Sequence, residues 1–420
     1  MLRFCVLFLG LLSAFFFRVQ ADSVPASVFI LPLDNGSANY TFALNLPANS
    51  DDIYFHLSGP ASYSWIAVGT GREMKDSMMF IVYSNAQGDG VTVSPRLSSG
   101  ETEPVFSSSL NVDELPGTGL SDNTMIVNGR CSNCRRWKTG SLDLTSRTQP
   151  WIYALGPHSG NSELLKSDSK TASIERHSEY GRFTMDMVLA TGGTGGLPTS
   201  FTTAVGSSED GKPHYDSNWP SILHALAICA AFVLLMPTGV FVLRVFPASV
   251  RWHWVNQSLA SILAIAGGML GVYLSTMFTK SQSFGSSHQI IGLVCLAAVV
   301  VQWGLGFWHH RLFKIIKRPT RYGPIHRYFG RIILVLAVVN GGIGLTWSYA
   351  STRVVVGYII VVVVVGITVI AAVVWKRFTS RSRKKDGLMS EGLGGQYQGG
   401  YDSNIHLASY PEQQYNDRFQ

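Results

Sequence analysis

The chain has 420 residues, of which 46% are hydrophobic and 14% are charged, and its formal net charge at pH 7 is +7. This composition excludes a wholly disordered protein and leaves room for two or three domains. The charges are unevenly placed, because no acidic residue lies between Asp216 and Asp386. The positive excess therefore belongs to an apolar region and its flanks, which favours a membrane protein over a nucleic-acid-binding protein.

The N-terminus has the pattern of an export signal. Residues 1–21 contain an early basic residue, Arg3, followed by an apolar run over residues 5–17 and a small-residue pattern at residues 19–21. This order predicts a cleavable signal peptide over residues 1–21. The mature chain would then begin near residue 22, outside the cytoplasm.

Residues 22–190 have the pattern of an exported β domain. Short apolar or alternating runs such as "YTFALNL", "SWIAVGTG" and "MMFIVYS" are separated by turns rich in Gly, Ser, Asn and Pro. This pattern predicts an extracellular all-β antiparallel sandwich.

Two cysteines of this domain, Cys131 and Cys134, lie three positions apart in "GRCSNCRRW". In an oxidising compartment a short disulfide is favoured over a reactive redox pair. Arg135 follows the second cysteine where the c-type haem attachment motif has a histidine. Any haem in this domain is therefore expected to be bound non-covalently.

Spacing alone does not identify a metal site in the exported domain. However, the series "WIAVGTGREMKDSMMFIVY", "GRCSNCRRW", "GSLDLTS", "WIYALG" and "ERHSEYGRFTMDM" resembles the cytochrome domain of fungal cellobiose dehydrogenase, a sandwich of the DOMON class. The resemblance implies one haem b with Met74 and His177 as iron ligands, and a disulfide between Cys131 and Cys134. In this chain charged Arg72 and Glu73 stand beside the methionine, where the family usually has small residues.

Residues 191–219 are rich in Gly, Ser and Thr. Such a composition predicts a flexible linker. A flexible linker would let the exported domain approach the membrane part and then move to a partner.

Five uncharged runs follow one another in the second half of the chain. Each approaches or exceeds the ~20 residues that a helix needs to cross ~30 Å of hydrocarbon. The runs cover residues 221–243, 254–279, 281–308, 332–352 and 354–375. They predict an all-α bundle of five transmembrane helices within residues 220–376, followed by a disordered cytoplasmic tail over residues 377–420.

The loops between these runs predict the orientation. Fifteen Lys and Arg residues follow the first, third and fifth runs, whereas the loops on the opposite side contain only Lys280 and Arg353. The positive-inside rule therefore places the C-terminus in the cytoplasm and the exported domain outside. We expect a multi-pass protein of the plasma membrane, in contact with lipid and without a nucleic-acid partner.

Four histidines lie near the ends of the first four runs. His224 and His288 would lie near the outer surface, and His253 and His326 near the inner surface. Two imidazoles on facing helices can bind a haem iron from both axial positions. Interfacial histidines also serve as anchors or hydrogen-bonding groups, but four in matched pairs favour haem binding, because polar residues inside a membrane are usually functional.

The segments that carry these histidines resemble a known family. "HALAICAAFVLLMPTGVFVLR", "HQIIGLVCLAAVVVQWGLGFWHH" and "HRYFGRIILVLAVVNGGIGL" resemble helices of the cytochrome b-561 family. The resemblance implies a four-helix core with two haems b, one held by His224 and His288 and the other by His253 and His326.

Together these features predict a transmembrane electron carrier with three haems b. A cytoplasmic small-molecule reductant such as ascorbate would reduce the inner haem, and an extracellular acceptor such as ferric iron or a secreted oxidoreductase would receive the electron. Methionine ligation tends to raise the haem potential, which favours outward flow. No catalytic residue is assigned, because no nucleotide-binding loop and no nucleophile with its base is found.

Two other function classes are compatible with parts of the sequence. A surface receptor or adhesin could bind a glycan through the sandwich and use the helices as an anchor, although five helices exceed what an anchor needs. A solute transporter is disfavoured, because the spans have neither a charged substrate site nor a repeated broken-helix pattern.

Overall fold

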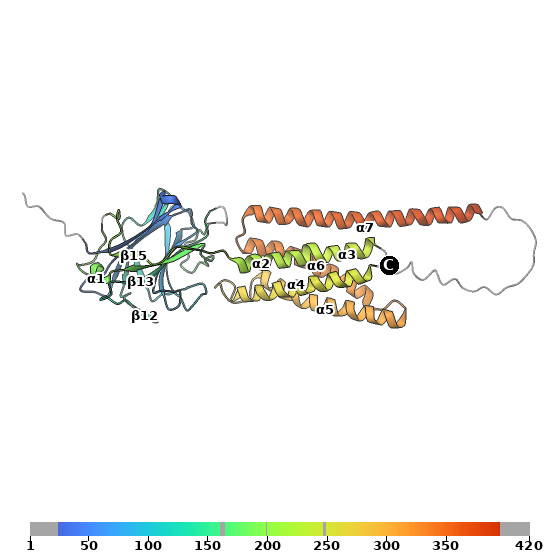
Figure 1. Ribbon diagram of the computed structural model, residues 1–420, viewed down its shortest axis with the longest axis horizontal. Helices are drawn as coiled ribbons and strands as arrows, with labels where there is room; N and C mark the ends of the chain where they lie inside the picture. Colours follow the sequence, from blue (N-terminus) through green and yellow to red (C-terminus); the bar gives the residue numbers. More distant parts are fainter. Residues whose placement is uncertain (1–23, 160–163, 199, 247–248, 395–420) are drawn as a thin grey trace, which may run out of the picture.

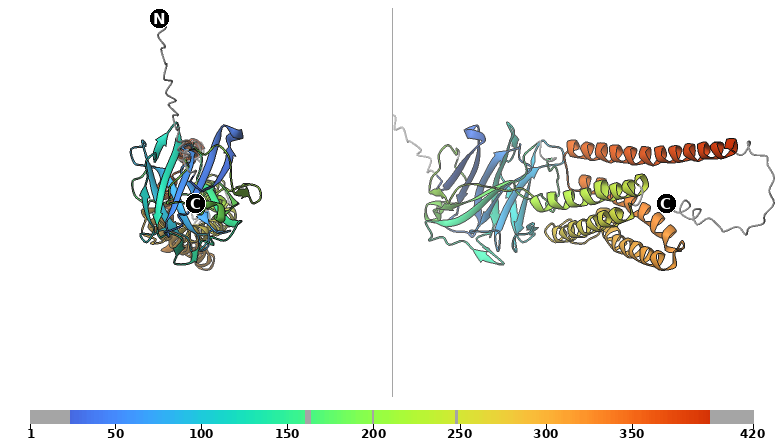
Figure 2. Two further views of the ribbon diagram at one scale, coloured as in Figure 1. Left: turned by 90° about the vertical axis from the view of Figure 1, so that its left-hand side faces the viewer. Right: turned by 45° about the vertical axis from the view of Figure 1, so that its right-hand side comes forward.

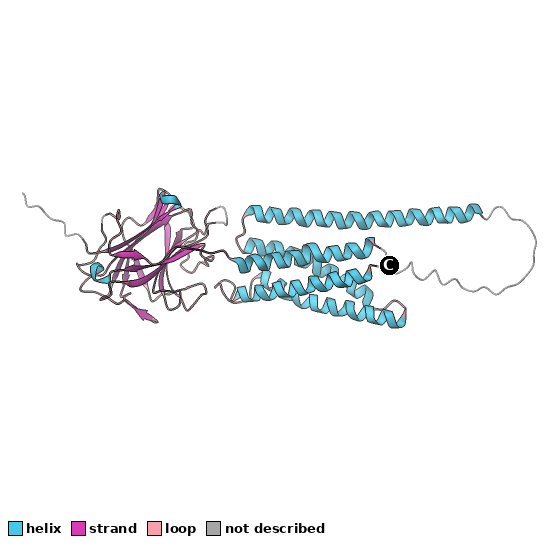
Figure 3. Ribbon diagram, in the orientation of Figure 1, coloured by secondary structure: helices cyan, strands magenta, loops and turns pink. Residues whose placement is uncertain are grey.

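The computed structural model describes residues 24–159, 164–198, 200–246 and 249–394, so the predicted signal peptide lies outside the described residues. A β-sandwich stands at one end of the molecule and a bundle of long helices at the other (Figures 1 and 3). This arrangement confirms the predicted fold class, an all-β antiparallel domain followed by five membrane-spanning helices.

The first sheet of the sandwich has six antiparallel strands in the order β1-β2-β3-β10-β8, with β9 paired to β10. Its strands are β1 (Ser27–Leu33), β2 (Ala38–Asn45), β3 (Ile53–Pro60), β8 (Asn111–Glu114), β9 (Gly119–Ser121) and β10 (Thr124–Ser132). A short 3-10 helix, η1 (Asp34–Gly36), joins β1 to β2.

The second sheet has eight strands in the order β15-β14-β13-β4-β5-β6-β7, with β16 paired to β14. Its strands are β4 (Ile66–Thr70), β5 (Met78–Ser84), β6 (Val91–Leu97), β7 (Val105–Phe106), β13 (Gln149–Leu155), β14 (Glu179–Met185), β15 (Ser207–Glu209) and β16 (His214–Tyr215). A hairpin of β11 (Arg136–Trp137) and β12 (Gly140–Ser141) and a short helix α1 (Met187–Ala190) complete the domain.

The alternation of side chains along the strands gives the second sheet two apolar faces. Residues such as Val68 and Phe80 point into the sandwich and pack in its main core. Their neighbours Ala67 and Met79 point the other way and join a second cluster on the outer face of the sheet, together with Ile174. This second cluster shows that the outer face is covered by more of the chain.

The cover is the segment of residues 164–178, here called the strap. Its backbone carbonyls accept hydrogen bonds from side chains of β5 and β6: Tyr83 Oη to Ser169 O at 2.5 Å and Thr92 Oγ1 to Ser167 O at 2.7 Å. The strap is therefore held against the outer face of the eight-stranded sheet, immediately before β14.

Several residues of the segment predicted to be a flexible linker, residues 191–219, pair with the sandwich. β15 and β16 both lie in this segment and pair with β14, and Val205 exchanges backbone hydrogen bonds with Val28 at 2.7 and 2.9 Å. Phe201 stacks on His56 with ring centroids 4.0 Å apart. Composition missed this pairing because an edge strand such as β14 offers backbone groups to any extended segment, whatever its side chains.

The helical part contains five helices long and apolar enough to cross a membrane, among the residues that the structure describes. The first is continuous from Trp219 to Val245 and is made of α2 (Trp219–Cys229), a π-helical turn η2 (Ala230–Leu235) and α3 (Met236–Val245). The others are α4 (Val250–Ser275), α5 (Ser287–Ile316), α6 (Tyr322–Trp347) and α7 (Thr352–Gly394).

The π-helical turn of the first span directly precedes the helical segment that contains Pro237. The backbone N–H of Met236 donates to Ala231 O, five residues back. Proline has no N–H to continue the helical pattern, so the wider turn absorbs the break within a continuous span.

Helix α7 lies beside the other four spans and has no buried residue in its most apolar window (Figure 2). It continues to Gly394, so residues 377–394 are helical where the sequence predicts a disordered tail. A helix already formed in the apolar span propagates into polar residues at little cost, because only its first turn is expensive. The remaining tail lies outside the described residues.

The aromatic pair Phe55 and Phe80, which joins the two sheets, should dominate the stability of the sandwich. The rings are stacked 4.2 Å apart and both side chains are buried. We expect Phe80→Ala to destabilise the exported domain by about 3–5 kcal/mol, through lost burial and the cavity left behind. Pulse proteolysis in urea on the full-length protein measures the effect. Val105→Ala, at an exposed position, is the matched control, and equal stability of the two variants would contradict this prediction.

Candidate functional site

The outer histidine pair is formed by His224 of α2 and His288 of α5. Their ring centroids lie 6.1 Å apart and the rings are nearly perpendicular, at 86°. Two imidazole nitrogens on opposite sides of one metal ion, each about 2 Å from it, place the ring centres on the order of 6 Å apart. The observed separation therefore fits two axial ligands of one iron.

Both rings of the outer pair are oriented by backbone carbonyls of neighbouring helices. His224 Nδ1 lies 2.7 Å from Gly267 O on α4, and His288 Nδ1 lies 3.1 Å from Asn340 O on α6. A carbonyl oxygen only accepts, so Nδ1 carries the proton in each ring and Nε2 keeps a free lone pair. This is the tautomer that an iron ligand needs.

Glycines on facing helices make room for both rings. A Cβ added at Gly271 would lie 2.6 Å from His224 Cε1, and one added at Gly344 would lie 2.5 Å from His288 Cε1. Such distances are closer than carbon atoms approach, so each ring occupies space that only glycine leaves open.

The inner pair shares part of this construction. His253 Nδ1 lies 3.0 Å from Gly239 O on α3, and a Cβ added at Gly306 would lie 2.8 Å from His326 Cε1. The His326 Nδ1 is buried and has no hydrogen-bond partner among the described residues, although Gln302 Nε2 donates to the His326 backbone oxygen at 2.8 Å.

Helix lengths separate the two pairs. On α4, His253 precedes Gly267, the partner of the outer pair, by fourteen residues, and on α6 His326 precedes Asn340 by the same number. At 1.5 Å per residue, both helices place the inner pair about 21 Å from the outer pair. The outer pair lies at the end of the bundle that faces the sandwich (Figure 1).

The predicted ligands of the sandwich are Met74, in the loop between β4 and β5, and His177, in the strap, and their surroundings are here called the exported site. Met74 is half-buried and packs against the outer-face cluster that contains Ile174 of the strap. His177 follows three residues later, and its Nδ1 is buried without a hydrogen-bond partner among the described residues. The structure thus places Met74 on the outer face of the eight-stranded sheet and His177 near the end of the strap that covers this face.

The surroundings of His177 favour a neutral ring. Burial, and then the charge of Arg176, lower the pKa of its imidazole, whereas Asp216 opposes the shift. The Asp216 carboxylate lies 3.9 Å from Nδ1, too far for a hydrogen bond, and its strong partner is Arg176 Nε at 2.6 Å. A neutral imidazole can donate a lone pair to iron at physiological pH.

The charged residues beside Met74 point away from this site. Arg72 and Glu73 are exposed, whereas the methionine side chain turns toward the apolar cluster. The departure from the family pattern therefore changes the rim of the site and leaves the thioether in place.

The predicted disulfide between Cys131 and Cys134 is confirmed. It closes the turn after β10, its Cα atoms lie 5.6 Å apart, and both residues are buried in the main core. The bridge is structural and does not contact the exported site described above.

Lys280, which the sequence identified only as a loop charge, lies next to the outer pair. Its Nζ donates to Trp347 O at 3.1 Å and sits over the rings of Trp347 and Tyr349, at 5.0 and 4.1 Å from their centroids. Trp347 is 5.9 Å from the His288 ring. No local sequence pattern predicts this contact, because it depends on how the loops meet.

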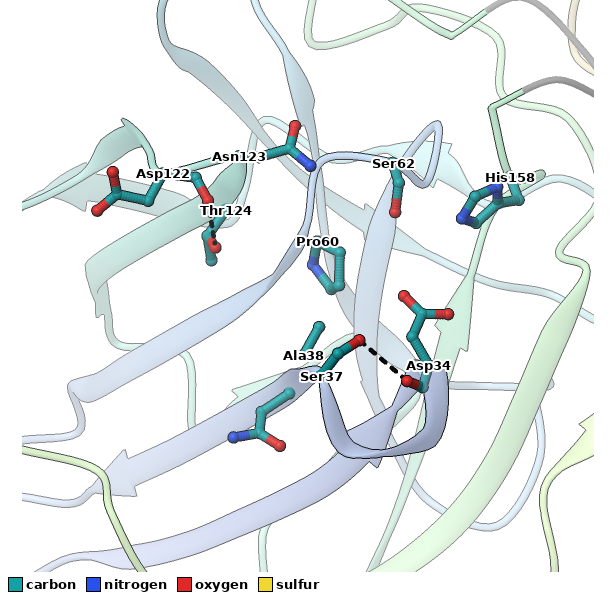
Figure 4. Close-up of a pocket in the computed structure, with 10 residues that line it drawn as sticks. Asp34, Ser37, Ala38, Pro60, Ser62, Asp122, Asn123, Thr124 and His158 are labelled. Atoms are coloured by element: carbon teal, nitrogen blue, oxygen red, sulfur yellow. Dashed lines mark hydrogen bonds between the residues drawn. The ribbon is translucent and has the colours of Figure 1, made fainter.

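A separate polar pocket of about 390 Å³ lies on the sandwich (Figure 4). Asp34, Asp122 and His158 are among its lining residues, and Ser37 Oγ donates to Asp34 O at 2.9 Å. It contains none of the predicted iron ligands.

Two families match the chain. Residues 26–192 match the cytochrome domain of cellobiose dehydrogenase, and residues 223–352 match eukaryotic cytochrome b561. These matches confirm both resemblances seen in the sequence. Cytochromes of these kinds bind haem b, and the histidine pairs and the exported site have the donor atoms that haem iron requires.

Two solved structures resemble the sandwich. The cytochrome b domain of pyranose dehydrogenase from Coprinopsis cinerea is 20% identical, with a TM-score of 0.34, and the match covers 39% of this chain and 83% of that one. The cytochrome domain of Myriococcum thermophilum cellobiose dehydrogenase is 15% identical, with a TM-score of 0.28, covering 34% and 76%. No curated protein matches the chain.

Replacing Gly344 by alanine tests whether the outer pair needs the space that this glycine leaves. The added methyl group would displace the His288 ring, so we expect Gly344→Ala to lose or shift the absorption of one haem b. Gly366→Ala, in α7 with no atom near the added methyl group, is the control. Reduced-minus-oxidised spectra of the purified variants give the answer, and identical spectra for the two would contradict the assignment of His288.

Proposed function

The chain belongs to the eukaryotic cytochrome b561 family over its membrane part and to the cellobiose dehydrogenase cytochrome family over its sandwich, and on that premise we propose that it passes electrons through three haems b. Haem-based electron transfer across a membrane follows from the families themselves. The positions of the three haems, their order, the donor and the acceptor belong to the proposal.

The observation that carries the proposal is the geometry of the outer pair. Two histidines from different helices lie 6.1 Å apart, each with Nδ1 at a helix carbonyl and its remaining nitrogen free. Ordinary packing does not require two imidazole rings to lie this close together inside a membrane, where polar groups are costly. We assign this space to one haem b.

The inner pair, His253 and His326, would hold the second haem, and Met74 with His177 the third. Bound haem iron supplies a reversible one-electron couple at each site. The protein residues would hold the iron, keep the ligand nitrogens free of protons and exclude water from the bundle, whose inner core is apolar.

The orientation follows from charge. The basic residues gather at the end of the bundle with the inner pair, which by the positive-inside rule is the cytoplasmic end. Arg244, Arg327 and Arg331 lie close enough for their charges to interact. A positive field at this end would attract an anionic reductant such as ascorbate.

The direction follows from the ligands. A methionine and a histidine tend to give a higher haem potential than other axial sets. Electrons would therefore move from the cytoplasmic reductant through the inner and outer pairs to the exported site. The external acceptor would be ferric iron, which would make the protein a ferric reductase, or a secreted oxidoreductase.

Proteoliposomes with ascorbate trapped inside and a ferric chelate outside test the function. We expect the wild-type protein to reduce the chelate, because electrons cross through both histidine pairs. His326→Gln should lower the rate to that of protein-free vesicles. Only protein molecules whose cytoplasmic end faces the vesicle interior should reduce the chelate. The fraction in this orientation is measured by the accessibility of the exported domain to added protease.

His158→Gln, which changes an imidazole in the sandwich pocket, is the matched control and should leave the rate unchanged. Chelate reduction that persists in His326→Gln would contradict the route. A glycan-binding receptor would lose nothing in either variant.

A further inference from the structure

One buried carboxylate, that of Glu103, lies where the sandwich meets the membrane part. Its side chain is 1% exposed. Within the sandwich, Oε1 accepts hydrogen bonds from Arg96 Nη1 at 3.3 Å and from the backbone N–H of Ile174 at 2.8 Å, and Oε2 accepts one from Ser173 Oγ at 2.9 Å. Glu103 thus joins β6 to the strap.

The same residue also holds the loop between α4 and α5, residues 276–286, here called the outer loop. Oε2 accepts from both the backbone N–H and the hydroxyl of Thr279, each at 2.8 Å. The backbone N–H of Glu103 donates to Met277 O at 2.9 Å. Three hydrogen bonds therefore connect this one residue to the membrane part.

A buried carboxylate is costly unless it is paired and hydrogen-bonded. Arg96, itself 1% exposed, supplies the opposite charge, and the strap and the outer loop supply the other donors. Since donors from both domains satisfy one charge, separating the domains would leave it partly unsatisfied. Hydrogen bonds to a charged carboxylate are stronger than those between neutral groups, and their geometry fixes which atoms of the two domains meet.

On the sandwich side, the contact leads to the exported site. Arg96 Nη2 donates to Ala172 O at 2.5 Å, and Trp65 Nε1 donates to Glu175 O at 3.1 Å. These bonds fix the strap on both sides of Ile174, and His177 lies three residues beyond it. The position of that ligand is therefore coupled to the position of Glu103.

On the membrane side, the contact leads to the outer pair. Gln289 Nε2 donates to Ser281 O at 2.7 Å and to Ser275 Oγ at 2.9 Å, which ties the middle of the outer loop and the end of α4 to the start of α5. Gln289 also forms a capping box with Ser286 and directly follows His288. The outer loop and the outer pair therefore form one rigid unit.

We propose that Glu103 is a positioning residue that docks the exported domain on the outer loop and so fixes the distance between the exported site and the outer pair. This inference rests on the proposed function, because the distance matters only if electrons pass between the two sites. The rate of electron tunnelling falls exponentially with the distance between the two sites, so electrons would pass between them in the docked arrangement. Pairing of β15 and β16 with β14 shortens the connection to α2 and supports docking over free swinging.

Glu103→Gln should keep the hydrogen bonds to Arg96 and Ile174 within the sandwich while weakening those to the outer loop. The amide oxygen of glutamine can still accept from Arg96 and from Ile174, which preserves the sandwich. Its amide nitrogen cannot accept from the backbone N–H of Thr279, so this bond to the outer loop is lost, and the hydroxyls of Thr279 and Ser173 would have to accept rather than donate. Loss of a charge-assisted hydrogen bond should lower the docked population by roughly tenfold or more.

The measurement is the rate at which the exported haem is reduced after the membrane haems, followed by stopped-flow spectroscopy of full-length protein in nanodiscs. We expect a rate independent of solvent viscosity in the wild type, and a slower, viscosity-dependent rate in Glu103→Gln. Thr279→Val, which removes one donor without touching the sandwich, should shift the rate in the same direction by less. Absorption spectra recorded before mixing would check that every variant retains its haems.

Glu101→Gln and Gln282→Ala are the matched controls, since Glu101 is an exposed acid two residues away and Gln282 an exposed residue of the outer loop. Both should behave as the wild type. A wild-type rate that depends on viscosity, or equal rates in Glu103→Gln and Glu101→Gln, would overturn the docking proposal and leave the electron route intact. An exported haem that is never reduced would instead refute the proposed function.

Discussion

A histidine ring inside a membrane needs one nitrogen satisfied and the other free if it is to bind a metal, and the bundle is arranged around that requirement. Three of the four membrane histidines place Nδ1 at a carbonyl oxygen of a neighbouring helix, at 2.7 to 3.1 Å. A carbonyl at this distance demands close helix packing. Glycines such as Gly271 and Gly344 permit the rings to lie against the facing helix, so the helix spacing, the ring orientation and the ligand chemistry depend on one another.

The same dependence explains why the pairs lie at two depths. α4 and α6 each contribute a histidine to the inner pair and, fourteen residues later, a carbonyl to the outer pair. A helix cannot change this spacing of about 21 Å without losing its own backbone hydrogen bonds. The exported domain has no such scaffold, and its ligands come from a loop and a strap that the side chains of β5 and β6 hold in place.

Much of this organisation could be predicted from the sequence, because long apolar runs, alternating strands and ligand-type residues near span ends are local signals. The five spans, the sandwich and the disulfide are confirmed. The pairing of β15 and β16 with β14 was not predicted, since pairing at a sheet edge leaves no mark in composition. The helical residues 377–394 were not predicted either, since α7 extends beyond its apolar residues. The contacts of Glu103 and Lys280 depend on how distant loops meet, so no short stretch of sequence predicts them.

The most direct measurement of the central claim is the number of haems b per chain in the purified full-length protein, from pyridine haemochrome absorbance and quantitative amino-acid analysis. Two membrane pairs and one exported site predict three, with two of them remaining when the exported domain is removed by proteolysis. A ratio of one or less, or a proteolysed membrane part without two haems, would contradict the account.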